Sequence, residues 1–83
     1  MSTKLFVGSL PWSVNDEGLK HTFEKHGSVV SAKVIMDRYT SKSRGFGFVE
    51  MENSTDASKA MRALNNSKID GRNIVVNEAI ARN

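Results

Sequence analysis

The sequence predicts an α+β domain with the element order β-α-β-β-α-β. Short runs rich in β-branched and aromatic residues, which are typical of strands, alternate with two polar segments whose apolar residues recur every three or four positions, as in amphipathic helices. Glycine, asparagine and aspartate residues lie between these segments, where turns are expected. This order predicts a split β-α-β (ferredoxin-like) sandwich, in which a four-stranded antiparallel sheet has both helices on one face.

The first part of the chain contains an expected strand and an expected helix. The strand covers Lys4–Ser9 and ends before a proline, which cannot extend a hydrogen-bonded ladder. The helix is expected over Asp16–His26, because Asn15 is a suitable N-cap and two acids follow it at the positive end of the helix. Leu19 and Phe23 lie four residues apart and predict its buried face.

An expected hairpin and a second helix follow. Val29–Met36 and Arg44–Met51 both have strand-like composition, and the polar loop between them predicts an antiparallel pair. The second helix is expected over Ser54–Leu64, because its apolar residues recur at helical spacing. Asn53 and Asp56 resemble a capping box with a shortened acid at its start.

The last part of the chain contains a turn and a fourth strand. Asp70-Gly71 is a typical turn pair, and Ile74–Val76 with its neighbours has strand composition. We therefore expect a single domain over residues 1–83, with its core between about residues 4 and 79.

Composition limits the class of protein. The chain is 39% hydrophobic and 25% charged, which is ordinary for a globular domain. No apolar run exceeds three residues, so neither a membrane-spanning helix nor a secretion signal is expected. The absence of cysteine excludes a disulfide framework, a zinc ribbon and a thiol nucleophile. His21 and His26 lie five residues apart, which does not fit a helical metal pair, so no metal site is expected.

The positive charge is concentrated in one segment. Residues 33–44 contain four basic residues and one acid, and this segment accounts for the whole formal excess of +3. The four basic residues are Lys33, Arg38, Lys42 and Arg44. A local anionic partner is therefore predicted, and the simpler alternative is a solvated basic loop.

The third expected strand carries the most specific motif. Arg44–Met51 fits the octamer K/R-G-F/Y-G/A-F-V-x-F/Y at six of its seven specified positions, and only Met51 departs from it. Leu5–Leu10 resembles the hexamer that accompanies this octamer. From Lys4 to about Ala79 the chain resembles the RNA recognition motif family, in particular short single-motif proteins of bacteria and the motif of plant glycine-rich RNA-binding proteins. The resemblance implies RNA binding on the sheet.

Strand alternation predicts which side chains form that surface. Successive residues of a strand face opposite sides, so Phe46 and Phe48 share one face while Val49 and Met51 share the other. If Val49 packs under the helices, the two phenylalanines lie on the open face, and the same reasoning turns Phe6 outward. Exposed rings can stack on unpaired bases, whereas the simpler alternative is that all three are core residues.

Polar residues are expected around the three rings. Lys33 and Asn77 should share their face, together with Ile35 and Val75. In the family, the residue that matches Arg44 contacts a phosphate. The complete set of expected RNA-binding residues is Phe6, Phe46, Phe48, Arg44, Lys33, Lys42, Arg38 and Asn77. Trp12 is expected to pack under its loop.

These observations favour a single-stranded RNA-binding module that performs no catalysis, uses no cofactor and acts as a monomer. It would serve as a post-transcriptional regulator or an RNA chaperone. Single-stranded DNA is a second expected ligand, because stacking does not need a 2′-hydroxyl group. The expected location is the cytoplasm, in particular the bacterial cytosol, or the nucleus or an organelle in a eukaryote. A protein-interaction domain is the main alternative, whereas an acylphosphatase-like hydrolase is disfavoured because the loop over Ser9–Val14 has no arginine.

Overall fold

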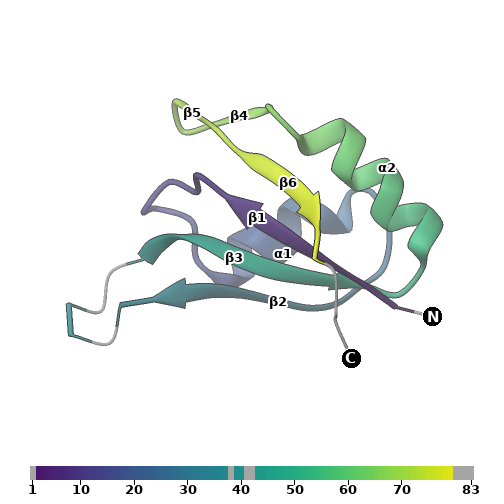
Figure 1. Cartoon of the computed structure of the whole chain (residues 1–83), viewed down its shortest axis with the longest axis horizontal. Helices are drawn as coiled ribbons and strands as arrows, with labels where there is room; N and C mark the ends of the chain where they lie inside the picture. The colour runs from purple at the N-terminus through teal and green to yellow at the C-terminus, as the bar shows by residue number, and fades with distance from the viewer. Residues whose placement is uncertain (1, 38, 41–42, 80–83) are drawn as a thin grey trace.

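The computed structural model describes residues 2–37, 39–40 and 43–79, with the backbone alone at positions 43 and 44. Within these residues, two helices and six strands follow one another (Figure 1). They are β1 (Thr3–Gly8), α1 (Asp16–Glu24), β2 (Val29–Met36), β3 (Ser43–Met51), α2 (Ser54–Leu64), β4 (Lys68–Ile69), β5 (Arg72–Asn73) and β6 (Val75–Glu78). Over the described residues, neither helix is long and apolar enough to cross a bilayer.

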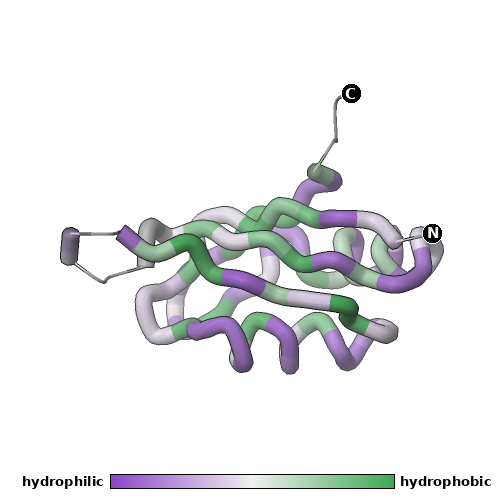
Figure 2. Tube along the Cα trace, turned by 90° about the horizontal axis from the view of Figure 1, so that it is seen from below, coloured by the Kyte–Doolittle hydropathy of each residue, from purple (hydrophilic) through white to green (hydrophobic). Residues whose placement is uncertain are grey.

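Four strands form one antiparallel sheet in the order β2-β3-β1-β6. The helices form a second layer on one side of this sheet, and the other side of the sheet stays open (Figure 2). The predicted α+β fold and the split β-α-β arrangement are therefore confirmed.

The core lies between the sheet and the two helices. Leu5 on β1 pairs with Val49 on β3, and both side chains are buried against the helical layer. Phe23 of α1 is the largest fully buried side chain. The whole buried hydrophobic cluster consists of Leu5, Val7, Leu10, Leu19, Phe23, Val34, Val49, Met51, Ala57, Ala60, Ile74 and Val76. Val49 and Met51 thus face inward, as strand alternation predicted.

Helix α1 begins at the predicted cap. The side chain of Asn15 accepts a hydrogen bond from the backbone N–H of Gly18 at 2.8 Å, which satisfies one of the unpaired donors of the first turn. Asp16 then accepts a 2.7 Å hydrogen bond from the N–H of Val34, which ties the start of the helix to strand β2. The helix ends at Glu24 and not at the predicted His26.

The start of α2 differs from the expected capping box. Asn53 occupies the N-cap position, but its side chain makes no capping hydrogen bond to the helix backbone. Its amide instead donates to the carboxylate of Asp56 over 3.4 Å. A capping box needs bonds from both side chains to the backbone of the first turn, and here the two side chains bond to each other, so the predicted capping box was wrong. Both ends of the helix were predicted correctly.

The predicted Asp70-Gly71 turn closes a small hairpin that the sequence did not predict. Asp70 has a φ of 48° and Gly71 a φ of 85°, the positive values that a two-residue hairpin turn of type I′ requires. Strands β4 and β5 pair across this turn. The hydroxyl of Ser13, in the loop after β1, donates to the Asp70 carboxylate at 2.5 Å and connects the two loops. Strand β6 covers Val75–Glu78, and Ile74 of the predicted strand lies immediately before it.

Candidate nucleic-acid interface

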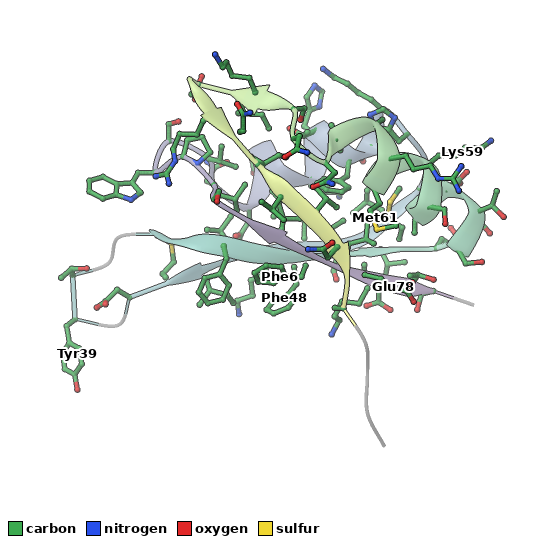
Figure 3. All side chains as sticks on the ribbon, turned by 45° about the horizontal axis from the view of Figure 1, so that its top comes forward. Phe6, Tyr39, Phe48, Lys59, Met61 and Glu78 are labelled. Carbon is green, nitrogen blue, oxygen red and sulfur yellow. The ribbon has the colours of Figure 1, made fainter. Side chains whose placement is uncertain are left out.

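Three phenylalanine rings meet on the open face of the sheet. The Phe6 ring centroid lies 5.9 Å from that of Phe46 and 5.8 Å from that of Phe48, and the centroids of Phe46 and Phe48 are 6.4 Å apart. All three side chains are half-buried, because they shield one another while one side of the cluster stays in solvent. Figure 3 shows Phe6 and Phe48 on the opposite side of the sheet from Lys59 and Met61 of α2. The core alternative for these rings is therefore wrong.

The backbone register brings the rings together. Phe6 on β1 lies directly opposite Phe48 on β3, and Gly8 lies opposite Phe46. A Cβ atom on Gly8 would lie only 3.0 Å from Cε1 of Phe6, so the glycine leaves the space that this ring occupies. The three rings thus form a surface that crosses the two central strands.

Polar side chains extend this surface toward both edges of the sheet. Lys33 on β2 pairs with Phe48, and Asn77 on β6 pairs with Phe6, which completes a row across all four strands. Both of these polar residues are exposed. Val75 lies opposite Gly8 on the same face and is 36% exposed. The predicted positions of Lys33, Asn77 and Val75 beside the rings are confirmed. Ile35 lies in a register irregularity between β2 and β3.

The basic residues near the β2–β3 hairpin are only partly described. The backbone of Arg44 lies in β3, but its side chain is outside the described residues. Arg38 and Lys42 also lie outside the described residues. The contacts of these three residues with phosphate therefore stay predictions. Tyr39 is 90% exposed and points away from the rings at the hairpin (Figure 3).

Trp12 differs from its sequence-based interpretation. Its side chain is 69% exposed, so the prediction that it packs under its loop was wrong. It lines an open groove of about 380 Å³ at the β2 edge, together with Val14, Met36 and the acidic start of α1. The preceding proline is buried, in contrast to the exposed indole.

A second polar row, next to the rings, was not assigned a role from the sequence. Lys4 on β1 lies opposite Glu50 on β3, two residues along each strand from the Phe6–Phe48 pair. The hydroxyl of Ser2 donates a 2.5 Å hydrogen bond to Oε2 of Glu50. Strand alternation puts Glu50 on the same face as Phe48, and the signal that was missed is its paired register with a lysine.

The rings and the polar side chains around them can contact nucleic acid. Flat aromatic surfaces bind bases by stacking, and lysine and asparagine side chains at their margins can contact phosphates and base edges. Among the described residues, no three histidine, aspartate or glutamate side chains lie close enough to hold a metal ion.

Comparison with known proteins supports this interpretation. The model of the RNA recognition motif family matches residues 5–75. The chain belongs to the RNA recognition motif family. The predicted membership is confirmed, and the chain is an RNA-binding module of this family.

The similar proteins include plant RNA-binding proteins. Glycine-rich RNA-binding protein blt801 of Hordeum vulgare is 46% identical over 79 residues, which are 95% of this chain and 49% of that protein. The 29 kDa chloroplastic ribonucleoprotein of Arabidopsis thaliana is 47% identical over 95% of this chain and 23% of its own length. The chain therefore spans about half, or less, of the length of these relatives. The predicted likeness to plant glycine-rich RNA-binding proteins is confirmed.

Solved structures of the family superpose closely on this chain. The crystal structure of RNA binding protein PG1 has a TM-score of 0.91 and 43% identity, and the match covers 98% of each chain. The Sxl-lethal protein/RNA complex has a TM-score of 0.87 and 34% identity over 93% of this chain and 47% of that chain. The sheet and both helices are therefore those of the family.

Proposed function

We propose that the protein binds single-stranded RNA on the open face of its sheet, with bases stacked on Phe6 and Phe48. The observation that supports this most directly is the cluster of three half-buried rings, with centroid separations of 5.8 to 6.4 Å, on the face that the helices leave open. Exposed rings lower the solubility of a domain unless a partner covers them, and unpaired bases offer matching flat surfaces.

The shape of the site favours a single strand over a duplex. In a duplex the bases stack on one another, and their faces are not available to a protein ring. Stacking on Phe6 and Phe48 needs two bases that have left such a stack. Single-stranded DNA should bind as well, since the ring contacts do not involve the 2′-hydroxyl group.

Positive side chains would hold the RNA backbone beside the stacked bases. Lys33 lies in the same row as Phe48 and is exposed, which suits contact with a phosphate next to the base on that ring. Arg38, Lys42 and Arg44 complete the proposed basic margin, because the whole formal excess charge lies in residues 33–44. Asn77 at the other end of the row would hydrogen bond to the base on Phe6.

The proposed role is binding without catalysis or a cofactor, by a monomer that folds as one domain over residues 1–83. Such a module would act as a post-transcriptional regulator or as an RNA chaperone. We propose that it binds cellular transcripts, and that it does so in the bacterial cytosol, or in the nucleus or an organelle of a eukaryote. The organellar alternative is supported by the chloroplastic ribonucleoproteins among the relatives.

Ring deletions test this proposal. Phe6→Ala, Phe46→Ala and Phe48→Ala should each weaken binding of a short single-stranded RNA by about 1–3 kcal/mol, because each removes a stacking surface. Each should destabilise the fold much less than Phe23→Ala, which opens a cavity in the core and should cost about 3–5 kcal/mol. Fluorescence anisotropy gives the affinity, and urea melts give the free energy of unfolding.

The two measurements separate the alternatives. If the three surface variants lost stability as Phe23→Ala does, and the folded fraction kept the affinity of the parent protein, the rings would serve the fold and not the RNA. If no variant, including the parent, bound RNA, a protein-interaction role for the same face would replace the proposal.

A further inference from the structure

The open face has a charged row immediately next to the proposed stacking rings. Lys4 and Glu50 lie opposite each other on the two central strands, and Ser31 on β2 pairs with Glu50 from the other side. Each residue lies two positions along its strand from a residue of the ring row, a distance of about 7 Å. A base stacked on Phe48 extends several ångströms from the ring, so its edge can reach side chains of this second row.

The carboxylate in this row already accepts one hydrogen bond. Ser2 donates a hydrogen bond to Oε2 of Glu50, and the Glu50 side chain is half-buried. A carboxylate accepts several hydrogen bonds at once, so the bond from Ser2 leaves it able to accept others. A negative group on a surface that binds a polyanion weakens binding unless it faces donors of the ligand, and the N–H groups of bases are such donors.

On the opposite side of the ring row, the side chains that the structure describes include no carboxylate paired with a lysine. There, Gly8 has no side chain, Phe46 presents a ring, and Val75 is aliphatic. A polar base edge directed over Gly8 and Val75 would lose its hydrogen bonds with water and gain none from these two residues. A base on Phe48 therefore gains most when its hydrogen-bonding edge points toward Lys4 and Glu50.

We propose that Lys4 and Glu50 select guanine for the base stacked on Phe48. This inference rests on the proposed RNA-binding function of the face. The Watson–Crick edge of guanine presents two adjacent N–H donors, N1 and N2, beside the acceptor O6. The two donors match the two oxygens of the Glu50 carboxylate, and O6 matches the ammonium group of Lys4.

The other bases do not match this pair. Uracil presents one N–H donor between two carbonyl oxygens, so at least one oxygen would face the carboxylate. Adenine and cytosine each present an amino group beside an unprotonated ring nitrogen, which is an acceptor and is repelled by the carboxylate. Guanine alone therefore satisfies both charged side chains.

A set of oligonucleotides tests the inference. The probes are fluorescein-labelled eight-residue oligouridines with guanosine, inosine, adenosine, cytidine or uridine at the fourth position, and binding is measured by anisotropy. Guanosine should bind about tenfold more tightly than adenosine, which is within the range for a bidentate base contact. Inosine lacks the N2 amino group and should fall between them.

Variants assign the preference to the carboxylate. In Glu50→Gln the guanosine preference should fall to about twofold or less, while the matched change Glu24→Gln on the outer face of α1 should keep it. Phe48→Ala should also lose the preference, because it removes the ring that positions the base. Lys4→Gln should weaken guanosine binding more than adenosine binding, and it provides an independent test if Glu50→Gln does not fold.

The outcomes distinguish failure of the inference from failure of the proposed function. If the parent protein bound all five probes equally, or Glu50→Gln kept the guanosine preference, the selection of guanine would be wrong while RNA binding stood. If Glu50→Gln tightened binding to every probe alike, the carboxylate would only repel phosphates, and the inference would again be wrong. If no probe bound, the proposed RNA-binding function itself would fail.

Discussion

At the scale of single residues, two glycines on opposite sides of the sheet are expected to matter for different properties, Gly47 for the stability of the fold and Gly8 for RNA binding. A Cβ atom on Gly47 would lie 2.5 Å from the carbonyl oxygen of Lys33 and 3.1 Å from Cα of Val34, which are backbone atoms of the neighbouring strand. A Cβ atom on Gly8 would instead meet the Phe6 ring at 3.0 Å, and this ring borders solvent. The clash at Gly47 can be relieved only by moving a strand, whereas the clash at Gly8 can be relieved by moving the Phe6 ring.

We therefore expect Gly47→Ala to destabilise the protein by about 1–3 kcal/mol, the usual cost of overpacking. Gly8→Ala should change stability much less, but it should weaken RNA binding because it displaces Phe6. Urea melts and anisotropy on both variants check this prediction. Equal loss of stability in the two variants would contradict it, because it would mean that the Phe6 ring is fixed as firmly as the core.

At the same scale, alternation along the strands predicted most of the candidate site. Phe6, Phe46 and Phe48 could be assigned to the open face because Val49 has to be buried, and the structure agrees. Trp12 could not be assigned, because a loop residue has no periodicity and its direction depends on contacts with distant segments. The bond between Ser13 and Asp70, 57 positions apart in the sequence, is such a contact.

At the scale of elements, the two helices start with the same residue type but different bonding. Asn15 accepts from the N–H of Gly18, whereas the Asn53 side chain makes no cap bond and donates to Asp56. Asn15→Ala should therefore destabilise the protein by about 1 kcal/mol, the typical value of an N-cap. Asn53→Ala should cost clearly less, which urea melts of the two variants would measure. A larger loss for Asn53→Ala would mean that its side chain caps the helix in solution.

The bounds of the elements show where sequence patterns are informative. Strand β2 and helix α2 have the predicted bounds at both ends, since β2 is rich in β-branched residues, α2 has apolar residues at helical spacing, and both have polar flanks. Strands β4 and β5 contain two residues each and pair only with one another, so they are too short to have a period. Their turn was predicted because the Asp-Gly pair tolerates positive φ angles.

At the scale of the whole molecule, a small two-layer domain leaves half of its sheet surface for binding. The principal extents are 35 × 30 × 19 Å, and the shortest one accommodates a single layer of helices on a single sheet. The core therefore uses one face of each strand, and the residues of the other face are free to serve recognition. Because of this division, substitutions of the three rings are expected to affect RNA binding, whereas substitutions in the core are expected to affect stability.

The charge distribution over the molecule leads to a prediction about salt. If roughly three phosphates are neutralised by basic residues beside the sheet, log K for a short single-stranded RNA should fall with log salt at a slope of about −2, with a dissociation constant near micromolar at moderate salt. Lys33 lies in the ring row, so Lys33→Gln should make the slope shallower by about 0.7, because one phosphate contact is lost. Lys20→Gln removes the same charge from the exposed side of α1 and should leave the slope unchanged, because that side faces away from the rings. Anisotropy titrations at four salt concentrations measure all three slopes. Equal changes for the two variants would mean that net charge, and not a localised phosphate contact beside Phe48, determines the affinity.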